Sequence, residues 1–318
     1  MLPDVSVIIP TRNRLPLLKI AIASCFHGNN DVVVEVIVVD DGSTDGTPQY
    51  LEGLGDSRVE FIRQESRGPQ VARNAGLERV GGRFVKFLDD DDWLAPGALR
   101  RELTRADATA ADVCSGDINV VDEKGALICE FPTSSGNDLF VELAMGRTTT
   151  HPLRFLIKRR LAQQVRWNPE IKCRQDVDYF LRIGLLARKP VSLHVNVGFF
   201  RQHTNARVST VSAEAGPRQQ LEIFLSLART FKDMGLNAEP RRMQVLRDAL
   251  WSTAHHCAVY DLAAARQGWA LSESLGEAGY HPVRSNPVLT WSDRVLGAQA
   301  TERLLLLPRR VRKAFSAF

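Results

Sequence analysis

Residues 84–92 read FVKFLDDDD, in which apolar side chains lead directly into four consecutive aspartates. An apolar run of this kind is typical of a buried strand, and the aspartates would lie where that strand ends. Adjacent carboxylates repel one another, and burial raises the cost of keeping them ionised. A divalent cation with oxygen ligands would relieve both problems, and such a cation often also binds phosphate oxygens. A solvated acidic loop is the simpler alternative, because most charge runs are of that kind.

The residues before this stretch alternate between apolar runs and helical patterns. Residues 5–9 and 33–39 are nearly continuous in Val and Ile, as strands covered on both faces should be. A helix is expected over 16–26, a short strand over 59–63, and a second helix from Pro69, since proline is tolerated at the first helical position. This alternation predicts an α/β fold with a mostly parallel sheet flanked by helices.

The pattern changes after about residue 113. The runs 118–121 and 127–129 flank Asp122-Glu123-Lys124-Gly125, which predicts a hairpin, and residues 191–200 return to strand. Helices are expected over five further segments: 139–145, 158–164, 177–187, 219–234 and 241–265. The predicted domains are residues 1–215, with halves over about 1–112 and 113–215, and a helical C-terminal extension over 216–318.

Composition narrows the class of protein. The composition, 44% hydrophobic and 25% charged residues, is typical of a globular protein. The 41 basic against 37 acidic residues do not indicate a nucleic-acid binder. Five scattered cysteines without a C-x-x-C pair suggest neither a zinc site nor a disulfide framework, and their odd number favours the cytoplasm. No signal peptide and no apolar stretch long enough to span a membrane is recognisable.

Polar residues follow three of the predicted strands. Pro10, Thr11 and Asn13 follow the first, Asp41 follows the second, and the aspartates follow the fourth. In open α/β sheets, ligands collect at the carboxyl ends of the strands. Taken singly, Thr11 or Asn13 could cap a helix, and Asp41 could belong to a turn. Neither a G-x-G-x-x-G motif nor a P-loop is present, so carboxylates and a metal would have to hold a nucleotide.

Together these motifs resemble family 2 glycosyltransferases. The resemblance is carried by VSVIIPTRNR (residues 5–14), VVDDGSTD (residues 38–45) and FLDDDD (residues 87–92) followed by Pro96. It covers roughly residues 3–210 and implies the GT-A fold, in which a nucleotide-binding α/β half merges into an acceptor-binding half. The last hundred residues lie outside it.

The resemblance also implies a nucleotide site. Thr11, Asn13 and Asp41 would line the nucleobase pocket, with Asp41 accepting from a base N–H. In the D-x-D motif over Asp89–Asp91, one carboxylate would hold the ribose and another Mn²⁺ or Mg²⁺ on the diphosphate. The full set of implied nucleotide-binding residues is Pro10, Thr11, Asn13, Asp41, Arg67, Asn74, Asp89 and Asp90.

The metal ligands implied are Asp90, Asp91 and His203. The run of four aspartates leaves open whether Asp90 or Asp91 binds the ion. Asp92 would contact the ligands without binding the ion itself. His203 would reach the diphosphate or complete the metal shell, although a lone histidine is more often structural. We interpret His151 as structural.

The catalytic base implied is Asp176. Residues 175–178, QDVD, resemble the acidic pair of the family, which often has Glu where this chain has Gln175. The alternative for Asp176 is a helix N-cap, and a carboxylate at a helix N-terminus would also be kept ionised. Asp178 is expected to pair with Arg182, four residues on.

The resemblance implies an inverting transfer of a sugar from a nucleotide-diphosphate sugar, most commonly a UDP-sugar. The acceptor would be a hydroxyl of a saccharide or a lipid-linked molecule, in surface polysaccharide or glycan synthesis. One alternative is a sugar-phosphate nucleotidyltransferase, although the glycine-rich loop of that class is absent after residue 9. The other is a non-catalytic nucleotide-sugar binder, against which the retained carboxylates argue.

The C-terminal tail combines apolar and basic residues. Leu304–Leu307 precede PRRVRKAF (residues 308–315) and Phe318. Such a segment suits the anionic inner face of a membrane, so a cytoplasmic protein with peripheral membrane contact is one expectation. A helix packed on the body with solvated arginines is the other.

Overall fold

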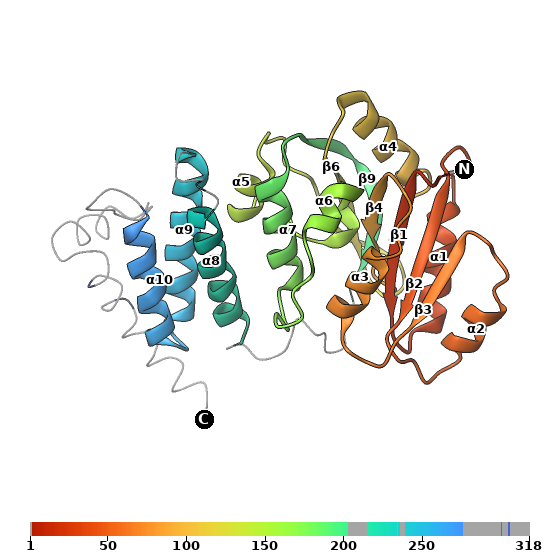
Figure 1. The fold of residues 1–318 in the computed structure, drawn as a ribbon, viewed down its shortest axis with the longest axis horizontal. Coiled ribbons are helices and arrows are strands. Elements are labelled where there is room, and N and C mark those ends of the chain that lie inside the picture. The colour runs from red at the N-terminus through yellow and green to blue at the C-terminus, as the bar shows by residue number, and fades with distance from the viewer. Residues whose placement is uncertain are drawn as a thin grey trace. The chain divides into compact units, whose positions relative to one another are not determined.

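The computed structural model describes residues 2–202, 215–233, 235, 239–275, 300 and 305 (Figure 1). The chain divides into two compact units, Met1–Arg207 and Val208–Phe318. This division lies close to the boundary expected after residue 215.

The first unit is built on a nine-stranded sheet with the strand order β3-β2-β1-β4-β8-β6-β9-β5, and β7 pairs with β6. The strands are β1 (Val5–Thr11), β2 (Val34–Asp40), β3 (Val59–Arg63), β4 (Phe84–Phe87), β5 (Trp93–Leu94), β6 (Val113–Val121), β7 (Leu127–Phe131), β8 (Phe155–Lys158) and β9 (Pro190–Arg201). β3, β2, β1 and β4 pair in parallel, whereas β8 is antiparallel to both β4 and β6. The expected α/β fold with a mixed sheet flanked by helices is confirmed.

Helices cover both faces of this sheet (Figure 1). They are α1 (Leu15–Phe26), α2 (Thr47–Gly53), α3 (Pro69–Leu77), α4 (Ala98–Thr109), α5 (Leu139–Ala144), α6 (Arg159–Gln164) and α7 (Gln175–Leu186). The sequence patterns had not indicated α2, α4 or β8. The hairpin of β6 and β7 is confirmed, and Gly125 takes a positive φ of 86° in its turn.

Strand β1 shows why a continuous apolar run was needed, because alternate side chains pack on opposite faces. Val7 and Ile9 belong to the core cluster that includes Leu18 of α1. Ile8 faces α3, where a Cβ on Gly76 would lie 2.5 Å from Ile8 Cγ2. Glycine at position 76 therefore lets α3 lie directly on the strand that ends at Thr11.

The second unit contains three described helices, α8 (Ala215–Asp233), α9 (Pro240–Cys257) and α10 (Leu262–Ser274). Their apolar faces meet in a small core that includes Phe224, Trp251 and Trp269. The single helix expected over 241–265 is wrong. The chain turns at residues 258–260, and the Asp261 side chain accepts from Ala264 N at 2.9 Å, which starts a new helix.

None of the helices in the described part of the chain is both long and apolar enough to cross a bilayer. The basic C-terminal tail after Pro308 lies outside the described residues.

Candidate active site

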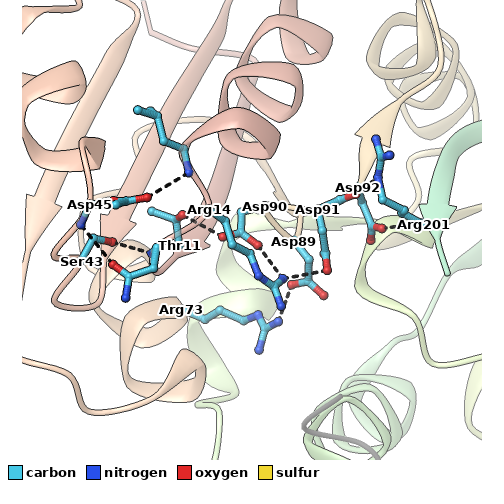
Figure 2. A network of polar contacts seen from close by, with 12 residues as sticks. Thr11, Arg14, Ser43, Asp45, Arg73, Asp89, Asp90, Asp91, Asp92 and Arg201 are labelled. Carbon is cyan, nitrogen blue, oxygen red and sulfur yellow. Dashed lines mark hydrogen bonds and ion pairs between the residues drawn. The ribbon is translucent and has the colours of Figure 1, made fainter. Parts of the chain in front are cut away.

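The polar residues that follow β1, β2 and β4 lie at one edge of the sheet. Val5–Thr11 pairs in parallel register with Val34–Asp40 on one side and with β4 on the other, so the three strands end together. Figure 2 shows Asp89–Asp92, which we call the acidic run, beside Thr11 and Arg14 at this edge. The strand ends thus bring together groups up to 79 residues apart.

Asp90 is held by residues that follow β1. Its carboxylate accepts from Thr11 Oγ1 at 2.7 Å and from Arg14 Nη1 at 3.1 Å. Burial raises the pKa of Asp90 to about 6, against the opposing effect of the Arg14 charge. Thr11 therefore contacts the acidic run directly, which is consistent with a place in a nucleotide site at this edge.

Arginines neutralise two other members of the acidic run (Figure 2). Arg14 Nη1 lies 2.7 Å from Asp91 Oδ2, and the buried Arg73 of α3 pairs with Asp89. Burial alone would raise the pKa of Asp89, but mainly the Arg73 charge outweighs it and the pKa is lowered. Part of the positive charge that the sequence argument assigned to a metal ion is therefore supplied by the chain.

Asp92 faces the other way from Arg14. One of its oxygens accepts from Arg201 N of β9 at 3.0 Å, and the other lies 3.5 Å from His151 Nε2. Burial, together with the neighbouring carboxylates, raises the pKa of Asp92 well above its usual range. Burial lowers the pKa of His151, which favours the neutral, ligating imidazole.

Asp89, Asp92 and His151 form a possible metal cluster. One ligand atom from each lies within 4.8 Å of the others. His151 Nδ1 and Asp92 Oδ2 are buried and have no hydrogen-bond partner. Two carboxylates and an imidazole fit a divalent ion such as Mn²⁺, for which oxygen ligands with one nitrogen are suitable.

This cluster differs from the ligand set that the resemblance implied. The expected ligands Asp90 and Asp91 instead contact Arg14, and His203 lies outside the described residues. His151, which we had interpreted as structural, is placed against the acidic run. No motif in the sequence marks His151, because it precedes β8 in an irregular segment.

Asp176 lies in the first turn of α7. The N-cap of that helix is Arg174, with a φ of 57°, so the interpretation of Asp176 as an N-cap is wrong. Thr150 Oγ1 donates to Asp176 Oδ2 at 3.1 Å. Because His151 follows Thr150 directly, Asp176 and the acidic run contact neighbouring residues of one segment. The expected pair of Asp178 and Arg182 is confirmed.

Asp41 is occupied by contacts with the loop before α3. Its carboxylate accepts from Arg67 N at 2.8 Å, Gly68 N at 2.9 Å and Gln64 Nε2 at 2.7 Å. Gly68 has a φ of 96°, which favours glycine there. The Arg67 side chain is exposed, so this residue reaches Asp41 through its backbone only.

Asn13 and Asn74 also make contacts within the chain. Asn13 has a φ of 55°, and its Oδ1 accepts from Thr44 N at 2.7 Å, which fixes the loop after β2. The Asn74 amide pairs with both backbone groups of Trp167, at 2.8 and 2.9 Å. Pro10 lies within β1, opposite Val39. These residues shape the edge of the sheet whether or not they also touch a ligand.

Arg14 and Arg73 are the residues that the sequence argument missed. Both stand beside predicted residues, in TRNR and ARN, but a single arginine in a motif gives no sign of its partner. Arg73 lies with its guanidinium carbon 4.4 Å from the Trp167 ring centroid, and its Nε and Nη1 are buried without hydrogen-bond partners. Such orphaned donors beside a carboxylate suit an anionic ligand.

Comparison with known proteins decides the family. The model of Glycosyl transferase family 2 matches residues 6–158. A Campylobacter jejuni protein named GalNAc(5)-diNAcBac-PP-undecaprenol beta-1,3-glucosyltransferase is 33% identical over 242 residues, which cover 73% of this chain and 75% of that protein. The chain belongs to glycosyltransferase family 2. The same chain is also 40% identical over 124 residues to the succinoglycan biosynthesis protein ExoO of Rhizobium meliloti. These residues cover 39% of this chain and 35% of ExoO.

The fold of the glycosyltransferase is similar to that of Staphylococcus aureus TarS. Residues 1–349 of TarS superpose with a TM-score of 0.66 at 19% identity, over 94% of this chain and 89% of that one. A TarS structure in complex with UDP-GlcNAc gives a TM-score of 0.59 at 18% identity, over 86% and 90% of the two chains. At such identity the likeness shows the fold, which is of the GT-A type.

Proposed function

We propose that this glycosyltransferase moves a sugar, with inversion, from a nucleotide-diphosphate sugar to an acceptor hydroxyl. The observation that carries the proposal is the segment Thr150-His151, which contacts both Asp176 and the acidic run. A base on one side and anion-binding groups on the other are what a single displacement requires.

The donor that we propose is a UDP-sugar, held by the nucleotide-binding half over about residues 1–112. The TarS complex with UDP-GlcNAc supports this choice by likeness of fold. In the proposed site, Thr11, Asn13 and Asp41 shape the base and ribose end, Asp89 lies near the ribose, and the orphaned donors of Arg73 face the diphosphate. Arg67 supports Asp41 from the loop before α3, and Asn74 supports the backbone of Trp167.

The metal that we propose is Mn²⁺ or Mg²⁺. Asp89, Asp92 and His151 are the residues that the geometry favours as ligands, with Asp90, Asp91 and His203 as the set that the motif favours. When bound, such an ion supplies a Lewis acid that neutralises charge on the departing diphosphate.

In the proposed mechanism Asp176 is the general base. The acceptor oxygen forms a bond to the anomeric carbon, its proton passes to Asp176, and the bond from that carbon to the diphosphate oxygen breaks. Asp176 lies in the first turn of α7, so its carboxylate stands near the positive end of the helix dipole.

The acceptor that we propose is a saccharide or a lipid-linked molecule, bound by the half over residues 113–215. The names of the Campylobacter and Rhizobium relatives, an undecaprenol-linked glucosyltransferase and a succinoglycan biosynthesis protein, support this class. A lipid-linked acceptor would place the protein at the cytoplasmic face of a membrane, with peripheral contact through the basic tail.

A thermal-shift screen of UDP-, GDP- and dTDP-sugars, each with and without Mn²⁺, tests the proposal. We expect the UDP-sugars to raise the melting temperature most, and more so with Mn²⁺. Release of UDP from the preferred donor would separate a transferase from a nucleotidyltransferase, which would release pyrophosphate from a nucleoside triphosphate instead. No stabilisation by any sugar nucleotide would contradict the proposal.

A further inference from the structure

The base that we propose is contacted by a residue with no assigned role. Thr150 Oγ1 donates a hydrogen bond to Asp176 Oδ2 at 3.1 Å, and both side chains are half-buried. These residues are 26 positions apart in the chain: Thr150 lies in the irregular segment before β8, and Asp176 lies in α7. A hydrogen bond to one carboxylate oxygen restricts rotation of the carboxyl group and so fixes the direction in which it can accept a proton.

The backbone that carries Thr150 is anchored on one side by a buried arginine. Arg154 is fully buried, and its guanidinium donates to Gly116 O at 2.9 Å and to Phe131 O at 2.8 Å. The same guanidinium donates to Thr149 Oγ1 from Nη2 at 3.1 Å. Thr149 is thereby tied to the β6–β7 hairpin, immediately before Thr150.

On its other side, Thr150 is followed by His151. The His151 ring lies 4.3 Å from the Phe200 ring between centroids, and its Nε2 lies 3.5 Å from Asp92 Oδ2. The peptide of Thr150 is therefore held between a core anchor and the acidic run, so its hydroxyl can hold Asp176 at a fixed place relative to the donor site.

We infer that Thr150 is a positioning residue for Asp176. It orients the carboxylate toward the acceptor hydroxyl and does not itself exchange a proton with substrate. This inference rests on the proposed function, because it presupposes that Asp176 is the base. It adds a residue outside the strand-end motifs, on the segment that also carries His151.

Three variants test it. Thr150→Val keeps the shape and removes the hydroxyl, Thr150→Ser keeps the hydroxyl, and Thr148→Val is the matched control. Thr148 is buried in the same segment, but its Oγ1 has no hydrogen-bond partner, so its removal breaks no hydrogen bond. The assay is release of UDP from the sugar nucleotide that stabilises most in the thermal-shift screen, with water as acceptor and Mn²⁺ present.

We expect Thr150→Val to lower kcat on the order of tenfold, the loss expected when a reacting group is less well oriented. KM for the sugar nucleotide should stay within about twofold, because the hydroxyl does not hold the donor. Thr150→Ser should restore most of kcat, and Thr148→Val should behave as the unmodified enzyme. A structural role for Thr150 would instead lower the melting temperature and leave kcat per folded molecule unchanged.

Full kcat in Thr150→Val, or failure of Thr150→Ser to restore a lost kcat, would overturn the inference. Asp176→Asn, measured in parallel, separates its failure from that of the proposed function. If Asp176→Asn is inactive while Thr150→Val is fully active, only the inference falls. If Asp176→Asn turns over normally, the base assignment falls and the inference with it. Adding Thr150→Val to Asp176→Asn should cause no further loss, and a further loss would show that Thr150 acts elsewhere.

Discussion

At the scale of single residues, the acidic run is balanced by cations that the fold brings from elsewhere. Arg73 pairs with Asp89 from 16 positions away, and Arg14 pairs with Asp91 from 77 positions away. The Arg73 charge outweighs burial and lowers the pKa of Asp89, so this carboxylate keeps its charge at neutral pH, whereas burial raises the pKa of Asp92 well above its usual range. The members of one run therefore differ in charge and in what they can bind.

This difference predicts how Asp92→Asn changes stability without metal. The raised pKa of Asp92 means that stability is lost as pH rises from the unfolded value, about 4, toward the folded value. The variant cannot lose a proton, so at pH 8 in EDTA we expect its free energy of unfolding to be higher than that of the unmodified protein, and the difference to be smaller at pH 5. Denaturant titration of both proteins at pH 5 and pH 8 measures the difference between their free energies of unfolding. A difference that did not increase from pH 5 to pH 8 would contradict the prediction.

The same variant separates the two candidate metal sites. If Asp89, Asp92 and His151 bind the ion, Mn²⁺ should raise the melting temperature of Asp91→Asn much as it raises that of the unmodified protein. Asp92→Asn should then lose most of that rise, because a ligand is missing. If Asp91→Asn loses the rise and Asp92→Asn keeps it, the ion is bound by the ligands that the motif implies, Asp90, Asp91 and His203.

Asp176→Asn should abolish transfer and leave donor binding intact. Loss of a general base costs about 10²–10⁴-fold in turnover, while the carboxamide keeps the size of the side chain. Turnover and the thermal shift produced by UDP with Mn²⁺ measure the two effects separately. Asp138→Asn is the control, because Asp138 caps α5 by accepting from Val141 N at 3.1 Å, and asparagine is also a good cap. Normal turnover in Asp176→Asn would show that another group is the base.

Among the elements, helix α3 connects the loop after β2, the acidic run and the segment before α7. Its N-terminal loop is held by Asp41, Arg73 reaches the acidic run, and Asn74 holds the backbone of Trp167. All three contacts depend on the close approach of α3 to β1, which only a residue without a Cβ permits at position 76.

We therefore expect Gly76→Ala to destabilise the protein. The added Cβ would lie 2.5 Å from Ile8 Cγ2, and such overpacking typically costs about 1–3 kcal/mol. Gly53→Ala in α2 is the matched control, because its Cβ would meet nothing within 4 Å and alanine reduces the freedom of the unfolded chain. Denaturant titration should show opposite signs for the two substitutions. Equal stability of Gly76→Ala and the unmodified protein would mean that α3 lies farther from β1.

At the scale of the whole molecule, the division into two units separates the sheet-based unit from a unit rich in helices. The described residues of the candidate site belong to the first unit. The second carries the basic tail, whose charge alone suggests a role at an anionic surface.

Replacing four tail charges should weaken binding to anionic vesicles. Each basic residue near such a surface contributes about 1 kcal/mol, so neutralising four should lower the partition coefficient by up to about a thousandfold. The residues are Arg309, Arg310, Arg312 and Lys313, each changed to Gln. The matched control changes four exposed basic residues of the helices, Arg229, Lys232, Arg241 and Arg266. Cosedimentation with vesicles of phosphatidylserine and phosphatidylcholine measures both, and equal binding by the tail variant and the unmodified protein would exclude a membrane role for the tail.

The strands that consist almost entirely of Val and Ile could be predicted, because a run of such residues within a few positions identifies a buried strand. For the same reason the ends of β1, β2 and β4, with Thr11, Asp41 and the acidic run, could be assigned to one edge of a parallel sheet. The break at Asp261 was missed although it is also local, because the apolar periodicity of α9 continues into α10 through the turn.

The fold class, the sheet edge that carries the candidate site, and the carboxylates at that edge can thus be inferred from local sequence patterns. The partner that each carboxylate meets depends on the packing of distant segments. Arg14 and Arg73 reach the acidic run, Thr150 reaches Asp176, and His151 reaches Asp92 only after distant segments pack on one another. The physical reason is that a strand end is fixed by neighbouring residues, whereas a hydrogen bond between remote side chains depends on how the whole core is filled.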